Sequence, residues 1–358
     1  MSNYMKYNGK VAFHPGYYIK ELVEESGLTQ EDFAKRLDTT PKNLSILIRG
    51  EQSLSNDIAM KLSRLTGTTI GYWLNLQKAY DTLVAEFASD QELKEERKVF
   101  DYLDYKYFRD NFGLEDHPRN KDAQAIETRM FLKVSTLNVL KKKDMAVNFR
   151  STAKVSETSI VKANAMVQIA TNIALEKDIP KFDKKKFEEA TQYALTQTTN
   201  HKCFYENIKK AFCDAGVVLV ILPNMSGSKT NGATKKVGDN IMIMVNDRRL
   251  NSDTFWFTLF HEIGHVNNGD YGISFEEEKG KTEELADKFA QDSLIDPIEY
   301  KDFIRARRYD AVSIKRFAEK IDRDPGIVLG RLQNDGKVGY TDRTLNSLRH
   351  KYKVIPSV

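Results

Sequence analysis

The sequence predicts an α+β protein that is mainly helical and has three parts along its 358 residues. Short helix-like segments separated by glycines fill residues 14–77, and a polar stretch with apolar residues at helical spacing continues to about residue 200. After Gly216, two aliphatic runs indicate the buried strands of a small sheet. We therefore expect an all-α domain at 1–78, a helical connector at 79–200 and an α+β domain at 201–358.

The composition excludes several classes of protein. With 41% hydrophobic and 30% charged residues, the chain has enough apolar material to fold, which argues against disorder. Its longest aliphatic run, residues 217–222, is far shorter than the roughly 20 residues of a membrane helix. The first residues show no secretory signal, so we expect a cytoplasmic protein without a membrane partner. Cys203 and Cys213 are too few for a disulfide framework.

The N-terminal part predicts five short helices, at residues 17–26, 30–37, 41–48, 55–66 and 70–76. Residues 28–50 have the layout of a helix-turn-helix. We expect the packed positions to be Phe33, Ala34, Leu37, Leu44 and Leu47, with Thr40 capping the second helix and Pro41 in its first turn. Lys42, Asn43 and Ile46 then face outward near the start of that helix, where a recognition helix meets base edges.

These residues, with His14, Pro15 and Gly16 before them and residues 72–77 (YWLNLQ) after them, resemble the Cro/repressor-type helix-turn-helix domain and its HigA-like antitoxin branch. The resemblance implies a double-stranded DNA operator as partner. It places Gln30, Thr39, Thr40, Lys42, Asn43 and Ile46 at DNA-facing positions, with Thr39 and Thr40 on phosphates. The alternatives are a helical bundle that merely shares the pattern and a domain kept for dimerisation. Since such domains bind paired half-sites, we also expect a homodimer.

In the C-terminal part, residues 217–222 and 241–245 predict strands, and the Gly-, Ser- and Asn-rich residues 224–239 between them predict a loop that reaches over a site. A helix capped by Ser252 or Asp253 follows, apolar nearly all the way round and hence buried.

This helix carries the sequence's sharpest motif, His261-Glu262-Ile263-Gly264-His265. Histidines four apart present both imidazoles on one face, at a separation that suits one zinc ion. Glu262 between them is placed to act as the general base on water activated by the metal.

A third ligand is expected from the acidic helix start about twenty residues downstream. Glu283 and Asp287 share a face, so one can bind the metal while the other orients a histidine. We favour Glu283 as the ligand and keep Glu284, one residue out of register, as the alternative.

From Gly216 onward the chain resembles the ImmA/IrrE family of metallopeptidases. The resemblance rests on residues 257–265 (FTLFHEIGH), 283–290 (EELADKFA), 294–297 (LIDP) and 327–333 (IVLGRLQ). One position departs from the family pattern, since Leu285 stands where a further acid is usual, and this favours Glu283. The resemblance implies a zincin-like fold, metalloendopeptidase activity of the gluzincin type, and a role in cleaving or controlling repressors.

Two functions follow as hypotheses. In the first, a zinc-dependent peptidase joined to its own DNA-binding module cleaves a protein partner, a repressor or a toxin–antitoxin component, which lies along the strand at residues 241–245. In the second, the protein is a HigA-like antitoxin or autorepressor whose peptidase-like domain binds a partner or senses a signal without cutting. The same ligands accept Zn²⁺ or Mn²⁺.

Overall fold

The computed structural model describes residues 3–142, 155–248, 251–275 and 280–354. The chain forms two compact units, Met1–Glu95 and Glu96–Val358. In the described residues it is mainly helical with two small sheets, which confirms the predicted α+β class. Among the residues described, no helix combines the length and the apolar character needed to cross a membrane.

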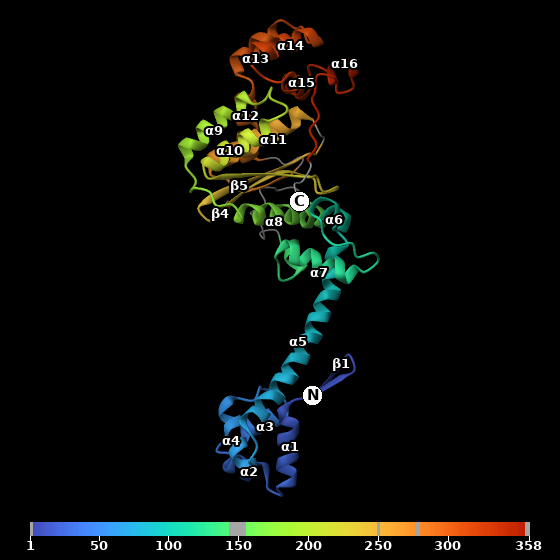
Figure 1. Ribbon diagram of the computed structural model, residues 1–358, viewed down its shortest axis with the longest axis vertical. Coiled ribbons are helices and arrows are strands. Elements are labelled where there is room, and N and C mark those ends of the chain that lie inside the picture. The colour runs from blue at the N-terminus through green and yellow to red at the C-terminus, as the bar shows by residue number, and fades with distance from the viewer. Residues whose placement is uncertain (1–2, 143–154, 249–250, 276–279, 355–358) are drawn as a thin grey trace. The chain divides into compact units, whose positions relative to one another are not determined.

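The first unit is a bundle of short helices (Figure 1). A hairpin of β1 (Tyr4–Tyr7) and β2 (Lys10–Phe13) precedes α1 (Pro15–Glu25), α2 (Gln30–Arg36), α3 (Pro41–Ile48) and α4 (Asn56–Thr66). The hairpin was not predicted. The five predicted core positions, Phe33, Ala34, Leu37, Leu44 and Leu47, are all buried. Thr40 caps α3 by accepting the backbone N–H of Asn43 at 3.1 Å, as its position before Pro41 predicted.

The last helix of this bundle does not end at residue 76, as the sequence pattern predicted. Instead α5 runs over Ile70–Phe100, 31 residues. No glycine or proline occurs between Gly71 and Gly113, so the chain contains no residue that would stop a helix there. The predicted boundary at residue 78 falls inside α5, and the three-part division stays a prediction.

The second unit begins with a series of helices and continues into the sheet. The helices before the sheet are α6 (Tyr105–Phe112), α7 (Lys121–Leu132), the 3₁₀ helix η1 (Leu137–Lys141), α8 (Glu157–Leu175), α9 (Lys184–Thr196) and α10 (Phe204–Asp214). The strands are β3 (Val217–Leu222), β4 (Thr230–Val237), β5 (Asn240–Asn246) and β6 (Gly272–Phe275). The later helices are α11 (Ser252–Asn268), α12 (Lys281–Leu294), α13 (Pro297–Arg305), α14 (Ala311–Lys320), α15 (Pro325–Asn334) and α16 (Arg343–Asn346).

The four-stranded sheet has the order β3-β5-β4-β6. β3 is parallel to β5, whereas β4 is antiparallel to both β5 and β6. Two expectations were therefore wrong. The predicted loop at residues 224–239 contains β4, a strand that pairs on both sides. Its polar residues and glycine do not follow the pattern of a strand in the sequence. The predicted peptide-binding edge, β5, is an inner strand whose backbone groups are already paired, so a peptide cannot join it.

Helices cover both faces of this sheet, with α8 on one face and α11 on the other (Figure 1). Successive strand residues point to opposite faces. Ile241, Ile243 and Val245 of β5 accordingly pack in the core cluster that includes α11, while Met242 and Met244 are buried toward the opposite face. Burial on both faces explains why the strands are continuously apolar.

The start of α11 also differs from the expectation. Its N-cap is Asn251, not Ser252 or Asp253, and it makes no side-chain capping bond. The two predicted caps are used in tertiary contacts instead. Ser252 Oγ donates to Asp324 Oδ1 at 3.0 Å, and Asp253 Oδ2 accepts from Arg349 at 2.7 and 2.9 Å.

The turn that joins α2 to α3 has a counterpart in the C-terminal unit, between α14 and α15. The sequences match at the same spacing, pairing Phe33 with Phe317, Ala34 with Ala318, Asp38 with Asp322, and Pro41 with Pro325. The backbone also matches, since Asp38 and Asp322 have φ values of 51° and 50°. However, α15 is buried along much of its length and packs against α11, whereas α3 begins with the exposed Pro41 and Lys42.

Gly16 at the start of α1 lies against the end of α3. A Cβ at this position would come within 2.0 Å of the backbone oxygen of Leu47. We expect Gly16→Ala to destabilise the first unit by roughly 2 kcal/mol, because the clash is with backbone rather than with a movable side chain.

The matched control is Gly71→Ala in α5, whose Cβ would meet only Thr69 Oγ1 at 3.9 Å. This change should leave stability within about 1 kcal/mol, on the stabilising side. In a Trp256→Phe background, Trp73 is the single tryptophan and its fluorescence follows urea unfolding of the first unit. Equal midpoints for the two variants would contradict the close packing of α1 on α3.

Candidate metal centre and DNA-reading helix

The two histidines of the HExxH motif project from one face of α11. His261 Nε2 and His265 Nε2 lie 3.0 Å apart, and both residues are buried. The helix ends at Asn268, three residues after His265, and is followed by Gly269, whose φ of 68° suits a helix C-cap.

The acidic side chain that completes this group comes from α12. Glu283 is buried, and its two oxygens lie 3.1 Å from His261 Nε2 and 3.3 Å from His265 Nε2. Glu284, the alternative in the sequence, is exposed. The structure therefore brings Glu283 and not Glu284 to the two histidines.

Close packing of α11 on α12 makes this approach possible. Gly264 lies between the two histidines, where a Cβ would be 3.1 Å from the Cα of Ala286 and 3.2 Å from the ring of Phe289. Ala286 is fully buried at the same contact. A larger residue at position 264 would push α12 away and draw Glu283 from the histidines.

Two further carboxylates orient the imidazole rings by contacting their Nδ1 atoms. Asp287 Oδ1 lies 2.8 Å from His261 Nδ1, and Asp270 Oδ2 lies 3.2 Å from His265 Nδ1. Such contacts hold the ring proton on Nδ1 and leave Nε2 as the ligand atom. The sequence pattern indicated Asp287 for this role, whereas Asp270 was not predicted. The sequence feature that could have indicated Asp270 is its position directly after Gly269, the glycine that caps the helix.

The electrostatics of this group favour a cation. Burial opposes protonation of His261, but the carboxylates of Asp287 and Glu283 outweigh it and raise the imidazole pKa to about 10. Burial likewise works against ionisation of Glu283, yet hydrogen bonds from His261 and His265 lower its pKa to about 2. A field that holds a proton on a buried histidine also favours a divalent cation among the same atoms.

Glu262 lies on the sheet side of α11 and is fully buried. Its carboxylate rests against β4, where a Cβ on Gly232 would come within 2.5 Å of Glu262 Oε1. Only a glycine leaves room for it. Gly232 was not predicted to lie here, because its segment reads as a loop in the sequence.

A β-bulge on β4 lies next to Gly232. The register with β6 shifts between Thr230 and Gly232, and bulges re-aim the side chain of the extra residue. That residue, Asn231, lines a cleft of about 140 Å³ at the candidate metal centre, together with His261, Glu283, Asp287, Phe257, Thr258, Ser274 and Phe275. No sequence pattern indicated Asn231, because the bulge depends on the pairing with β6.

The predicted DNA-facing residues lie around the α2–α3 turn. Gln30, Thr40 and Lys42 are exposed, while Thr39, Asn43 and Ile46 are partly buried. Asn43 is held on both sides, because its Nδ2 donates to Thr39 Oγ1 at 2.8 Å and its Oδ1 accepts from Gln52 at 2.6 Å. Gln52 was not singled out from the sequence. It fixes the orientation of Asn43 from beyond the end of α3.

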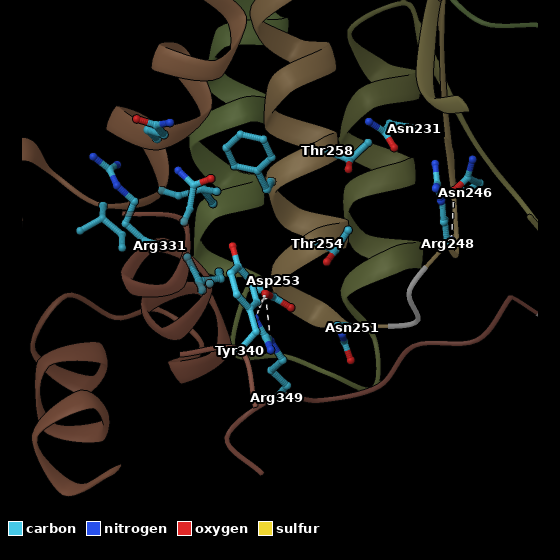
Figure 2. Close-up of a pocket in the computed structure, with 17 residues that line it drawn as sticks. Asn231, Asn246, Arg248, Asn251, Asp253, Thr254, Thr258, Arg331, Tyr340 and Arg349 are labelled. Atoms are coloured by element: carbon cyan, nitrogen blue, oxygen red, sulfur yellow. Dashed lines mark hydrogen bonds and ion pairs between the residues drawn. The ribbon is translucent and has the colours of Figure 1, made fainter. Parts of the chain in front are cut away.

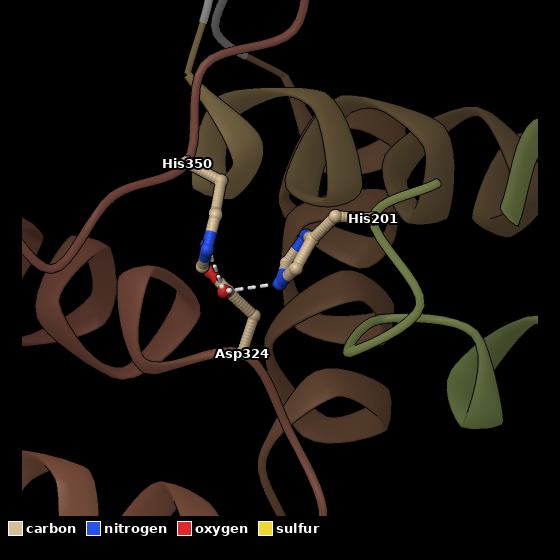
Figure 3. Close-up of side chains that lie close together, drawn as sticks. All are labelled: His201, Asp324 and His350. Carbon is tan, nitrogen blue, oxygen red and sulfur yellow. Dashed lines mark hydrogen bonds and ion pairs between the residues drawn. The ribbon is translucent and has the colours of Figure 1, made fainter. Parts of the chain in front are cut away.

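A second histidine and carboxylate cluster joins three separate segments (Figure 3). The fully buried Asp324 places Oδ2 at 2.8 Å from His350 Nδ1 and 3.4 Å from His201 Nε2. The two rings are stacked, with centroids 3.5 Å apart and an interplanar angle of 21°. Nearly parallel rings direct their lone pairs side by side rather than at one point, unlike those of a tetrahedral zinc site. We therefore interpret this cluster as a hydrogen-bonded clasp for the C-terminal segment.

The fold and these residues define a regulator-type helix-turn-helix module joined to a domain with an HExxH-centred group of metal-ligand residues. The helix-turn-helix family model matches residues 19–73, and the model described as the IrrE N-terminal-like domain, a peptidase family, matches residues 214–322. The chain therefore belongs to the helix-turn-helix regulators through its N-terminal part, and its C-terminal part is similar to the IrrE-like domain family.

Curated relatives cover the N-terminal part. An uncharacterized HTH-type transcriptional regulator, YddM of Escherichia coli K12, is 35% identical over 83 residues, 23% of this chain and 88% of that protein. Virulence-associated protein I of Dichelobacter nodosus is 34% identical over 80 residues, 22% of this chain and 74% of that protein. A solved structure from Nostoc punctiforme, described as a candidate antidote protein of a plasmid maintenance system, shows 27% identity and covers 24% of this chain and 92% of its own, with a TM-score of 0.23.

We expect purified protein to contain about one equivalent of zinc per chain. Glu283→Gln should lose most of this metal, because it removes a charged ligand from the pair of histidines. Elemental analysis after dialysis measures the loss. Glu284→Gln, one residue away and exposed, is the matched control and should keep its zinc. Full zinc retention in Glu283→Gln would exclude Glu283 as the third ligand.

Proposed function

We propose that this protein is a DNA-binding transcriptional regulator whose C-terminal domain is a zinc-dependent endopeptidase that cleaves a protein partner. The observation that carries the proposal is the convergence of His261, His265 and Glu283 within hydrogen-bond distance of one another, with Glu262 on the same helix. Their chemistry, two imidazole nitrogens and a carboxylate backed by further carboxylates, suits zinc, and it also accepts manganese.

The roles of the chain's own residues follow from this arrangement. Zinc bound by His261, His265 and Glu283 supplies the Lewis acidity for amide hydrolysis. Glu262 accepts a proton from the attacking water and returns it to the amide nitrogen of the leaving group. Asp287 and Asp270 keep the histidine rings in position throughout.

The N-terminal domain is proposed to bind double-stranded DNA as a homodimer on paired half-sites. The DNA-binding proposal is supported by the exposed side chains of Gln30 and Lys42 and by Asn43, whose orientation is fixed by Thr39 and Gln52. Ile46 on the same helix as Lys42 is proposed to contact a thymine methyl. Thr39 and Thr40 are proposed to contact phosphates.

Glu262→Gln tests the peptidase proposal. We expect this variant to lose cleavage by about a hundredfold to ten-thousandfold, which is the usual contribution of general acid–base catalysis, because the amide cannot accept the proton. It should keep its zinc and its DNA affinity. Protein captured from the native host by the variant, then incubated with wild-type enzyme and analysed by mass spectrometry, should show a new terminus. If wild type cuts none of the captured proteins, the non-proteolytic antitoxin or sensor function is favoured.

The DNA proposal is tested with operator fragments and random DNA. Lys42→Ala and Asn43→Ala should lower the preference for operator over random DNA by roughly tenfold, since a good base contact contributes about 1–3 kcal/mol of discrimination. Affinity should also fall steeply with salt as counterions are released. Lys98→Ala, in α5 and outside the helix-turn-helix, serves as control. Unchanged operator affinity after deletion of residues 1–78 would refute this domain as the reader.

A further inference from the structure

The β-bulge on β4 gives Asn231 an orientation that the regular strand would not. Gly232 lies against Glu262 of α11, so the next residue, Ala233, points to the opposite face of the sheet. Strict alternation would place Asn231 on the same face as Ala233. Because the register shifts between Thr230 and Gly232, Asn231 instead lines the cleft on the α11 side. Bulges are common next to active sites, where they re-aim a side chain.

This position is close to the groups of the proposed reaction. Asn231 directly precedes Gly232, where a Cβ would come within 2.5 Å of Glu262 Oε1. Asn231 also lines the cleft together with His261 and Glu283, two of the three proposed metal ligands. Because the cleft measures only about 140 Å³, a carbonyl group held in it contacts several of the residues that line it, Asn231 among them.

The side-chain amide of Asn231 is available to a ligand. Among the residues that the structure describes, none forms a hydrogen bond with it. Asn246 on the neighbouring strand β5 differs, because its Nδ2 donates to the backbone oxygen of Thr230 at 2.7 Å and its Oδ1 accepts from the backbone N–H of Arg248 at 3.0 Å. A few free polar groups of this kind fix the orientation of ligands in binding sites.

The chemistry of the cleft indicates what this amide binds. Glu283 and Asp287 line the cleft with carboxylates, which accept hydrogen bonds and repel negative charge. Asn231 supplies N–H donors and carries no charge. In amide hydrolysis the oxygen of the attacked carbonyl gains negative charge, and a donor that is already in place stabilises this charge without reorganisation.

Asn231 also lies where the cleft meets a larger cavity. Asn231, Phe257 and Thr258 line both spaces, and the larger one has a volume of about 350 Å³ (Figure 2). A polypeptide that extends from the metal centre into this cavity therefore passes beside Asn231. Thr258 also carries a donor, but it is part of α11, where the backbone oxygen four residues earlier competes for its hydroxyl.

We propose that Asn231 is a catalytic residue of the peptidase, whose Nδ2 donates a hydrogen bond to the oxygen of the scissile carbonyl as negative charge develops there. The proposal rests on the proposed peptidase function. As water attacks the carbonyl carbon, its proton passes to Glu262 and the π electrons of the C=O bond move to the oxygen that Asn231 binds.

The test measures the binding of small metal ligands to the full chain loaded with Co²⁺, whose visible spectrum changes when a ligand binds. Acetohydroxamate, which brings negatively charged oxygen to a metal, is the probe, and imidazole, a neutral nitrogen ligand, is the comparison. We expect Asn231→Ala to raise the Kd of acetohydroxamate by about tenfold or more, as the loss of one hydrogen bond to a charged group predicts. The Kd of imidazole should stay within about twofold, because imidazole offers no charged oxygen to the amide.

Asn231→Asp keeps the shape of the side chain but replaces the donor with a carboxylate, so it should weaken acetohydroxamate binding at least as much. Asn334→Asp on α15, exposed and lining the larger cavity but not the cleft, is the matched control and should bind the anion within about twofold of wild type. An unchanged Kd in both Asn231 variants would overturn the proposal. So would an equal loss of acetohydroxamate and imidazole binding, or a wild-type protein that does not bind acetohydroxamate.

These outcomes are separable from a failure of the proposed function. Protein that binds acetohydroxamate through Asn231 but cuts no partner retains the oxyanion-binding role and loses the peptidase. If Asn231→Ala cuts a captured partner at the wild-type rate, the peptidase is retained and Asn231 is excluded from the reaction. With Asn231 as proposed, kcat for that partner falls by about 10²–10³ while KM changes little.

Discussion

The packing of α11 against α12 is the interaction on which the C-terminal domain depends. α11 supplies two imidazoles and Glu262, and α12 supplies the carboxylate that completes a group able to hold a metal ion. Gly264 and Ala286 let the two helices meet closely. A glycine inside a helix costs up to about 1 kcal/mol relative to alanine. In this helix the glycine allows the close contact with α12, since a Cβ at position 264 would lie 3.1 Å from the Cα of Ala286.

The sheet fixes the other half of the same centre. β4 is antiparallel to β5 and presents Gly232 to the carboxylate of Glu262, while the bulge beside it turns Asn231 toward the cleft. The aliphatic strand β5 holds β4 in place and is itself enclosed between α8 and α11. The polar centre is therefore supported by two buried apolar layers, which limits the movement of its side chains.

Sequence reasoning succeeded where a pattern is local. The helix-turn-helix core, the capping by Thr40 and the shared face of His261 and His265 each depend on spacing within one or two helices, and the structure has them. It failed where the outcome depends on pairing between distant segments. The polar residues of β4 do not follow a strand pattern, because the strand is stabilised by its pairing with β5 and β6. Ser252 and Asp253 were interpreted as helix caps because their partners, Asp324 and Arg349, lie far along the chain.

The two helix-turn-helix turns show that a local sequence can determine a structure without determining how the protein uses it. Residues around Asp38 and Asp322 share sequence, backbone angle and the backbone bond that closes the turn, from Thr39 to Ala34 and from Arg323 to Ala318. Local sequence thus determines the turn in both places. The helix after the turn determines its use: α3 begins with the exposed Lys42 and the half-buried Asn43, whereas α15 has Gly326 and Ile327 at the equivalent positions, both buried. A motif that is proposed to read DNA in one domain therefore serves in the other as a wall packed against the helix of the metal centre.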